Sequence, residues 1–469
     1  MRFRWIRKIE QSTIVRVVRS GLINIIPVLT IGAFALILQT FPVDGYQWAI
    51  NNFAGGFFSQ LFEMVNKATF GVLSIYMTFS ISRSYFKMKA DSDAVFAGAA
   101  ISSLLSFFIL AGVNLENFNI DRMGPKSVFL AILAGLGASA LYISLNRFFR
   151  TRRKTLFSSG ADREFNRMLS MFFPIFAVAG IVALINVLVV RIFDVDSFRD
   201  LIVQLFNWLF SHGENGFIKG FFFVFLSSFL WFFGIHGSDT LEDVMQTYFV
   251  PGLAANQAAA AAGSAPTAIL TKEFFDCFVL MGGCGSAICL LIAILIFSRN
   301  RARRGLGLAA TFPMLFNINE LMTFGLPVVL NPVMLIPFLA VPLICYSVSY
   351  LALYLGIVPL ITNSAEWTTP ILLGGYKVTG SVAGLLLQLF NVILGVLVYM
   401  PFVRLLDHHT AEEDKRSYIA FMEFFRKNEA NPEIYKFTEL QNIYGDFAKE
   451  LCAELQHDTK RHVVIAYQP

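Results

Sequence analysis

A histidine and a glutamate lie in apolar stretches of this sequence, where burying an ionisable side chain costs free energy. His236 lies in the run LWFFGIHGSD, at the end of an apolar span, and Glu320 follows Asn317 and Asn319 in FNINEL. A charge at the centre of a bilayer costs about 2.5–3.5 kcal/mol on insertion scales, so a functional role is the default expectation. These side chains donate and accept hydrogen bonds, and an aromatic face such as that of Trp367 packs against C–H groups. The combination fits a carbohydrate, which offers hydroxyls on its edge and C–H groups on its face.

Each of these residues also has a structural explanation. His236 could be an interior histidine bonded to a backbone carbonyl, and Glu320 could cap a hairpin by accepting backbone N–H groups. Trp367 could be an anchor at the membrane surface, where aromatic residues are common. Glu63 and Lys67, spaced i,i+4, indicate a structural ion pair rather than a proton relay.

The composition indicates the class of protein that must position these residues. The chain has 469 residues, of which 56% are hydrophobic, only 15% are charged and 50 are phenylalanine. Soluble domains have about 25% charged residues, so this composition excludes a water-soluble enzyme, a disordered chain and a coiled coil. The sequence predicts an all-α polytopic membrane protein, with about ten transmembrane helices and re-entrant hairpins.

Charge divides the chain into an apolar body and a hydrophilic tail. Residues 407–469 hold 8 Lys/Arg and 12 Asp/Glu, whereas residues 1–406 hold 29 and 20. We expect a transmembrane sugar-binding domain over 1–406, a cytoplasmic helical linker over 407–460 and the first strand of a further domain at 461–469. The basic residues of the body are typical of cytoplasmic loops that face anionic membrane lipid, and they do not indicate a nucleic-acid partner.

Nine stretches are apolar enough to cross a membrane, for which about 20 residues are needed. Cytoplasmic loops are rich in lysine and arginine, and the first three basic clusters follow zero, two and four of these stretches, which places all three clusters in the cytoplasm. Only three stretches separate the third cluster from Arg299–Arg304, so one further crossing, the tenth in total, is needed to bring that cluster to the cytoplasmic side. The stretch 240–263 is long enough to supply it, which gives ten crossings and two cytoplasmic termini at the inner membrane. The nine stretches are 21–41, 57–82, 94–113, 127–149, 169–193, 217–236, 273–298, 331–357 and 380–404.

Two further stretches are apolar but broken by polar residues, proline and glycine. They are 308–332, which contains Glu320, and 361–380, which contains Trp367. Irregular backbone at membrane depth is tolerated where it lines a cavity or is buried in protein, and transporters place substrate at such breaks. Both stretches therefore indicate a binding site.

The five cysteines form neither a disulfide framework nor a metal site. Cys277, Cys284, Cys289 and Cys345 lie in apolar stretches, Cys452 lies in the tail, and no CxxC or Cys/His spacing is present. We expect reduced thiols, with no metal and no cofactor.

Six motifs together carry a resemblance to a known family. They are WFFGIHG (231–237), FNINE (316–320), FGLPVVLNP (324–332), EWTTP (366–370), RSGLINIIPVLTIGAF (19–34) and TKEFFDCFVLMGGCG (271–285). These motifs resemble the membrane component EIIC of the phosphoenolpyruvate-dependent sugar phosphotransferase system, in its lactose/cellobiose/diacetylchitobiose branch, over about residues 1–406. The sequence departs from the family at Leu321 and Glu366, where the family usually has proline.

The resemblance implies a homodimer with an N-terminal dimerisation half and a C-terminal substrate half. It implies that His236 and Glu320 hold a disaccharide near the hydroxyl to be phosphorylated, while Asn319 and Trp367 line the pocket. The phosphate would come from a separate EIIB-type protein that carries it on a cysteine. The sugar would be of the β-glucoside, cellobiose or chitobiose type.

The ending AELQHDTKRHVVIAYQP (453–469) resembles the opening of EAL-type cyclic-di-GMP phosphodiesterase domains. The acidic metal ligands of that family are absent from this sequence, so the chain cannot catalyse that reaction. An alternative function is therefore a sugar receptor that controls a fused EAL-type domain, and another is an ion-coupled symporter with Glu320 as proton carrier. The tail could also be a simple helical hairpin.

Overall fold

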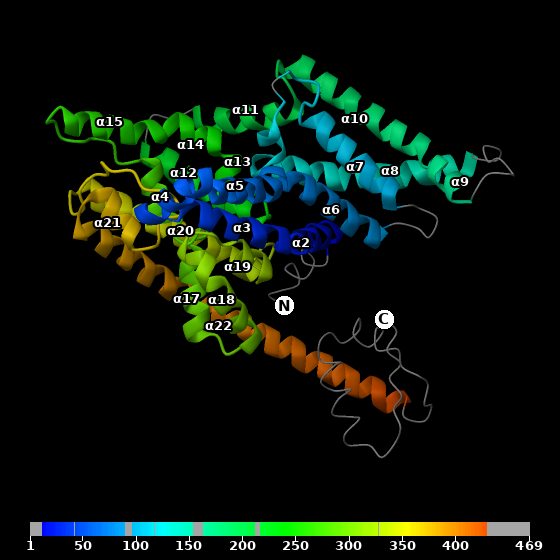
Figure 1. Cartoon of the computed structure of the whole chain (residues 1–469). Coiled ribbons are helices and arrows are strands. Elements are labelled where there is room, and N and C mark those ends of the chain that lie inside the picture. Colours follow the sequence, from blue (N-terminus) through cyan, green and yellow to red (C-terminus); the bar gives the residue numbers. More distant parts are fainter. Residues whose placement is uncertain are drawn as a thin grey trace.

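The computed structural model describes residues 12–41, 43–89, 96–116, 118–152, 163–211, 216–326 and 328–428. Over these ranges the chain is helical, without any β-strand, which confirms the all-α prediction (Figure 1). The N-terminal half contains α2 (Thr13–Asn24), α3 (Ile26–Thr40), α4 (Asp44–Asn52), η1 (Phe53–Gly55), α5 (Phe57–Thr69), η2 (Phe70–Val72), α6 (Leu73–Lys89), α7 (Phe96–Leu110), η3 (Ile120–Met123), η4 (Pro125–Ser127), α8 (Val128–Arg152), α9 (Arg163–Leu169), α10 (Phe172–Phe193) and α11 (Phe198–Ser211).

The C-terminal half is more broken and supplies most of the cavity described below. Its elements are α12 (Gly216–Phe232), α13 (Gly237–Thr240), α14 (Glu242–Tyr248), α15 (Val250–Ala261), α16 (Lys272–Phe274), the π-helix η5 (Phe275–Val279), α17 (Ala287–Phe297), α18 (Arg301–Leu315), α19 (Glu320–Gly325), α20 (Pro332–Tyr354), α21 (Leu373–Thr379) and α22 (Val382–Asn428).

In the N-terminal half, α6, α7, α8 and α10 pack against one another (Figure 1). Buried serines join three of these helices: Ser139 donates to Ser82 at 2.8 Å and lies 3.1 Å from Ser103. Small hydroxyl residues let helices approach closely in lipid and satisfy one another there. This packing gives the half a rigid frame.

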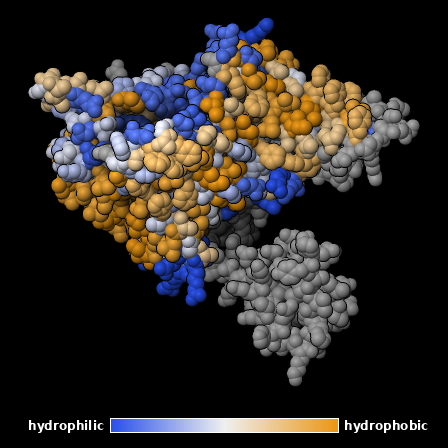
Figure 2. Space-filling model, viewed as in Figure 1, coloured by the Kyte–Doolittle hydropathy of each residue, from blue (hydrophilic) through white to orange (hydrophobic). Residues whose placement is uncertain are grey.

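Four helices of the described part are long and apolar enough to cross a membrane, and α2 with α3 forms a further candidate span bent by 46°. The four are Pro125–Phe149, Phe172–Ser211, Pro332–Tyr354 and Val382–His408. The chain is thus a multi-pass membrane protein. Figure 2 shows apolar residues over much of the visible face, with hydrophilic residues across its upper part and at its lower end, near the α17–α18 turn of Figure 1.

Three predicted spans differ from the structure. The stretch 57–82 breaks at Phe70, between α5 and α6, and 273–298 breaks between η5 and α17. The stretch 240–263 is broken as well, because it forms two helices, α14 and α15, of 7 and 12 residues, and its crossing of the membrane stays a prediction. At 1.5 Å per residue the longer of these two helices extends about 18 Å, short of a hydrocarbon core of about 30 Å. The total of ten crossings stays a prediction.

The break in 273–298 is a turn of small residues. Gly282, Gly283 and Gly285 have φ of 71°, 90° and 76°, and Ser286 has φ of 50°. Glycine adopts this region without steric cost, whereas side chains resist it. The run GGCGS therefore interrupts the helical backbone between η5 and α17 and leaves backbone groups that need other partners.

Helix α22 supplies those partners from one face. Three of its side chains donate to backbone carbonyls of the broken segment, and all three are buried. This support explains how irregular backbone persists in the protein interior, because buried carbonyls are rarely left unpaired. The donors, each with its acceptor, are Gln388 (Cys277 O, 2.7 Å), Asn391 (Phe278 O, 3.0 Å) and Tyr399 (Gly285 O, 2.6 Å).

Helix α22 also continues past the expected domain boundary at 406/407, to Asn428. At that boundary Asp407 forms an ion pair with the buried Arg303 and accepts hydrogen bonds from the Ser298 hydroxyl and the Arg299 N–H. The α17–α18 turn is thereby fastened to α22. Residues 429–469, and with them the predicted strand 461–469 and the EAL-like ending, lie outside the described residues, so the division into domains stays a prediction.

Candidate functional site

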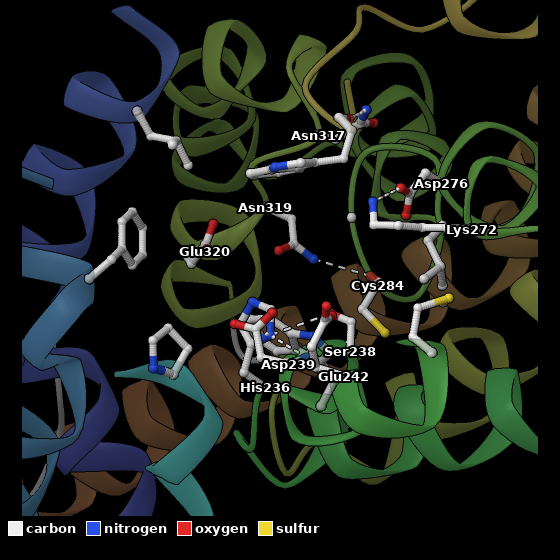
Figure 3. A pocket seen from close by; sticks show the side chains of 18 of the residues that line it. His236, Ser238, Asp239, Glu242, Lys272, Asp276, Cys284, Asn317, Asn319 and Glu320 are labelled. Atoms are coloured by element: carbon white, nitrogen blue, oxygen red, sulfur yellow. Dashed lines mark hydrogen bonds and ion pairs between the residues drawn. The ribbon is translucent and has the colours of Figure 1, made fainter. Parts of the chain in front are cut away.

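A cavity of about 400 Å3 lies between the two halves of the chain, and all five predicted site residues line it. Its volume falls within the range of about 300–1,000 Å3 typical of small-molecule sites. Figure 3 shows Glu320 and Asn319 close to each other, with His236 below them beside Asp239. The N-terminal half contributes Leu36, Asn66, Phe70 and Pro125 to the lining.

His236 is held at the turn that follows α12. It is the N-cap residue of α13, and the next residue, Gly237, packs so tightly that a Cβ there would lie 2.0 Å from the Ser227 carbonyl oxygen. The His236 Nδ1 atom lies 3.1 Å from Asp239 Oδ2 and 3.4 Å from Ser238 Oγ. The Nε2 atom has no hydrogen bond to any residue in the described ranges, and it is therefore free to bind a ligand.

Glu320 is the first residue of α19, directly after the loop in which α18 ends. Its Oε2 atom is buried and has no hydrogen-bond partner among the residues that the structure describes. Leaving a buried acceptor unpaired costs about 1–3 kcal/mol, and more for a charged group. Such an oxygen beside a cavity is expected to receive a donor from the ligand, and a sugar hydroxyl is a suitable one.

Asn319 lies next to Glu320 and is fastened from one side. Its Nδ2 donates to the Cys284 carbonyl at 3.2 Å. Gly283 packs against the same side chain, because a Cβ at this residue of φ 90° would lie 2.6 Å from the Asn319 amide carbon. The fastening leaves the amide oxygen as an acceptor toward the cavity (Figure 3).

Asn317 differs from the other predicted ligands because its amide is already bonded to backbone groups. Its Oδ1 accepts from the Gly282 N–H at 2.7 Å, and its Nδ2 donates to the carbonyls of Trp367 at 2.6 Å and Thr369 at 3.3 Å. Asn317 thus joins the glycine turn to the segment that carries Trp367. The geometry favours a positioning role for it, while direct contact with the sugar stays a prediction.

A double-mutant cycle tests this positioning role. We expect Asn317→Ala to weaken sugar binding about 10-fold in the native background and less than about 2-fold when Trp367→Ala is already present, because a residue that acts through Trp367 loses its effect with it. Titration calorimetry of the four proteins measures the coupling, and Asn52→Ala, at an exposed helical asparagine, is the control. Equal losses in both backgrounds would contradict the positioning role.

Sequence reasoning missed a charged group on the other wall of the cavity. Asp239, Glu242, Lys272 and Asp276 all line it, and Lys272 forms an ion pair with Asp276 one helical turn away. The signal was present, since Lys272 and Asp276 share the i,i+4 spacing that identified the ion pair of Glu63 and Lys67. Lys272 is fixed at the start of α16, where the Thr271 hydroxyl accepts from the Phe274 N–H at 3.1 Å.

In the described ranges, no group of three or more His, Cys, Asp or Glu residues is arranged to hold a metal ion. Cys277, Cys284, Cys289 and Cys345 are free and buried, and Cys284 also borders the cavity. Polar and aromatic side chains make up much of the cavity lining.

Comparison with known proteins identifies the family of this chain. The model of the family described as "Phosphotransferase system, EIIC" matches residues 19–342. The oligo-beta-mannoside-specific EIIC component of Bacillus subtilis is 26% identical over 419 residues, which cover 87% of this chain and 93% of the relative. The cellobiose-specific EIIC component of Geobacillus stearothermophilus is 27% identical over 429 residues, which cover 87% and 93%.

Among solved structures, the crystal structure of ChbC, the IIC component of an N,N'-diacetylchitobiose-specific phosphotransferase system, matches with 27% identity and a TM-score of 0.46. The match covers 87% of this chain and 97% of ChbC. None of these matches supports the EAL-like ending. Because the family model spans most of the apolar body, the chain belongs to the EIIC family, the membrane components of the sugar phosphotransferase system.

Proposed function

We propose that this EIIC component binds a β-linked disaccharide in the cavity and passes it across the inner membrane. The observation that carries the proposal is the buried Glu320 Oε2 atom, which has no hydrogen-bond partner among the described residues, beside a cavity that His236 and Trp367 also line. The names of the relatives, for oligo-beta-mannosides, lichenan and cellobiose, support the β-linked class.

Each of the four residues that would touch the sugar recognises a different part of it. Glu320 accepts a hydrogen bond from one hydroxyl, and His236 Nε2 contacts the hydroxyl that will receive phosphate. Asn319 offers its amide oxygen to a further hydroxyl, and the half-exposed Trp367 ring packs on a sugar face. A hydrogen bond to a charged group contributes about 1.5–3 kcal/mol, so the carboxylate is the largest single contributor.

The partners follow from the same proposal. A phosphate-carrying EIIB-type protein docks on the cytoplasmic side and phosphorylates the bound sugar, which is then trapped inside. A lactose-specific EIICB component of Staphylococcus haemolyticus, 24% identical over 417 residues, supports such a partner, because its name places both components in one protein. The subunits pair as a homodimer within membrane lipid, and both termini face the cytoplasm, as the basic clusters indicate.

Uptake by membrane vesicles that contain the whole protein tests the function. We expect labelled cellobiose to accumulate as a phosphate ester only when phosphoenolpyruvate and the soluble phosphotransferase proteins are enclosed, and an uncoupler should have no effect. Glu320→Gln vesicles are the negative control. Binding without uptake would favour a receptor, and uptake that an uncoupler abolishes would favour a proton-coupled symporter; either result overturns the proposal.

A further inference from the structure

The cavity carries more negative charge than a neutral sugar requires. Four carboxyl side chains line it, whereas Lys272 is the one lysine or arginine in the lining among the described residues. Figure 3 shows these groups on separate walls, with Lys272 and Asp276 across the cavity from Glu320. The four carboxylates belong to Asp239, Glu242, Asp276 and Glu320.

Two of the four carboxylates have no cationic partner in the described part of the chain. Asp276 is paired with Lys272, and Asp239 lies beside the His236 ring. Glu242 accepts from the neutral Gln246 amide at 2.6 Å, and the Glu320 Oε2 atom has no partner. Carboxyl groups therefore outnumber cationic groups in the lining of the cavity, even when a protonated His236 ring is counted as a cation.

A buried negative charge acts strongly on a ligand, because salt and water screen it less inside a cavity than at a surface. Phosphate sites in proteins use free arginine or lysine groups or several converging N–H groups. Here Lys272 is already engaged by Asp276, so a phosphate would meet carboxylates without a compensating cation. Such a repulsive element is an established means of specificity.

We propose that the carboxylates of Glu242 and Asp276, together with Glu320, make this cavity select against anionic sugars. The cavity holds neutral and amino-substituted glycosides and repels the phosphate ester formed from a bound glycoside. This inference rests on the proposed function and adds a role to it. The negative charge of the phosphoryl group lowers the affinity of the cavity for the phosphorylated sugar, which is the product of the reaction. Glu242 and Asp276 are then specificity-determining residues.

Competition binding with matched ligands tests the inference on the whole protein in detergent. The neutral probe is whichever of cellobiose, mannobiose, lactose and diacetylchitobiose binds most tightly, and the anionic probe is the 6′-phosphate of the same sugar. We expect the phosphate to bind at least about 50-fold more weakly than the neutral sugar. The fully deacetylated amine, chitobiose, should bind at least as tightly as cellobiose.

Two variants that each remove one carboxylate should strengthen binding of the anionic sugar, Asp276→Asn more than Glu242→Gln. Glu242→Gln removes one negative charge and keeps an acceptor for Gln246, so the ratio between neutral and anionic affinities should fall about 3- to 5-fold. Asp276→Asn removes a charge and frees Lys272, so the ratio should fall further, by about 10-fold or more. Asp243→Asn, beside Glu242 but outside the cavity lining, is the matched control and should leave the ratio unchanged.

Each outcome of this experiment is decisive. Retained affinity for the neutral sugar shows that each variant is folded, and a ratio that stays fixed in both variants overturns the inference. Equal binding of the neutral and phosphorylated sugars by the native protein overturns it as well, and leaves the proposed function intact. Failure of all four neutral disaccharides to bind overturns both.

Discussion

Replacing Glu320 by alanine is expected to abolish sugar binding, with a loss of about 100-fold or more in affinity. The carboxylate has a buried oxygen without a partner in the described residues, and a ligand hydroxyl that bonds to it gains a charge-assisted hydrogen bond. His236→Ala should have a similar effect, because it removes the ring nitrogen on the neighbouring wall. Titration calorimetry with the tightest-binding neutral disaccharide measures both.

The matched control for Glu320 is Glu63→Ala, which removes a carboxylate that pairs with Lys67 on the exposed side of α5. It should leave sugar affinity unchanged. Unchanged melting temperatures would show that the two site variants are folded. Native affinity in both site variants would reject the assignment of Glu320 and His236 to the sugar.

Gln388→Leu is expected to lower the free energy of unfolding by about 2–6 kcal/mol. Its amide accepts from the Gly375 N–H at 3.0 Å and donates to the Cys277 carbonyl at 2.7 Å, and leucine would leave both groups buried and unpaired. Each unpaired buried group costs about 1–3 kcal/mol. Thermal unfolding in detergent, followed by circular dichroism, measures the loss.

Gln60→Leu is the control, because Gln60 is exposed. It should change the melting temperature little, since exposed substitutions of this kind are usually within about 0.5 kcal/mol. A Gln388→Leu protein as stable as the native one would show that the broken segment 275–286 is held by its own contacts rather than by α22.

The sequence was informative where a residue conflicts with its immediate surroundings. His236 and Glu320 were identified because ionisable groups are costly within apolar runs, and both lie at the cavity. The spacing of Glu63 and Lys67 predicted an ion pair, which forms at 2.6 Å. In each case the conflict or the spacing is local, so a single chain was enough to reveal it.

Features that depend on distant partners could not be predicted. Gln388 and Asn391 lie within an apolar run, and their carbonyl partners are 111 and 113 residues away in the chain. Hydropathy averaged over 273–298 also concealed the break, although the glycines at 282, 283 and 285 were visible. The contribution of the N-terminal half to the cavity likewise depends on tertiary packing, which the pattern of apolar residues in the sequence does not predict.

The length of α22 gives the protein a lever. Arg303 forms an ion pair with Asp407, and at 1.5 Å per residue the helix from Asp407 to Asn428 extends about 32 Å beyond this contact. A tilt of the helix by about 10° at Asp407 would therefore move Asn428 by about 6 Å. The same rod carries Gln388, Asn391 and Tyr399 against the segment that borders the cavity. A small rearrangement at the cavity would thus be magnified into a larger displacement at Asn428.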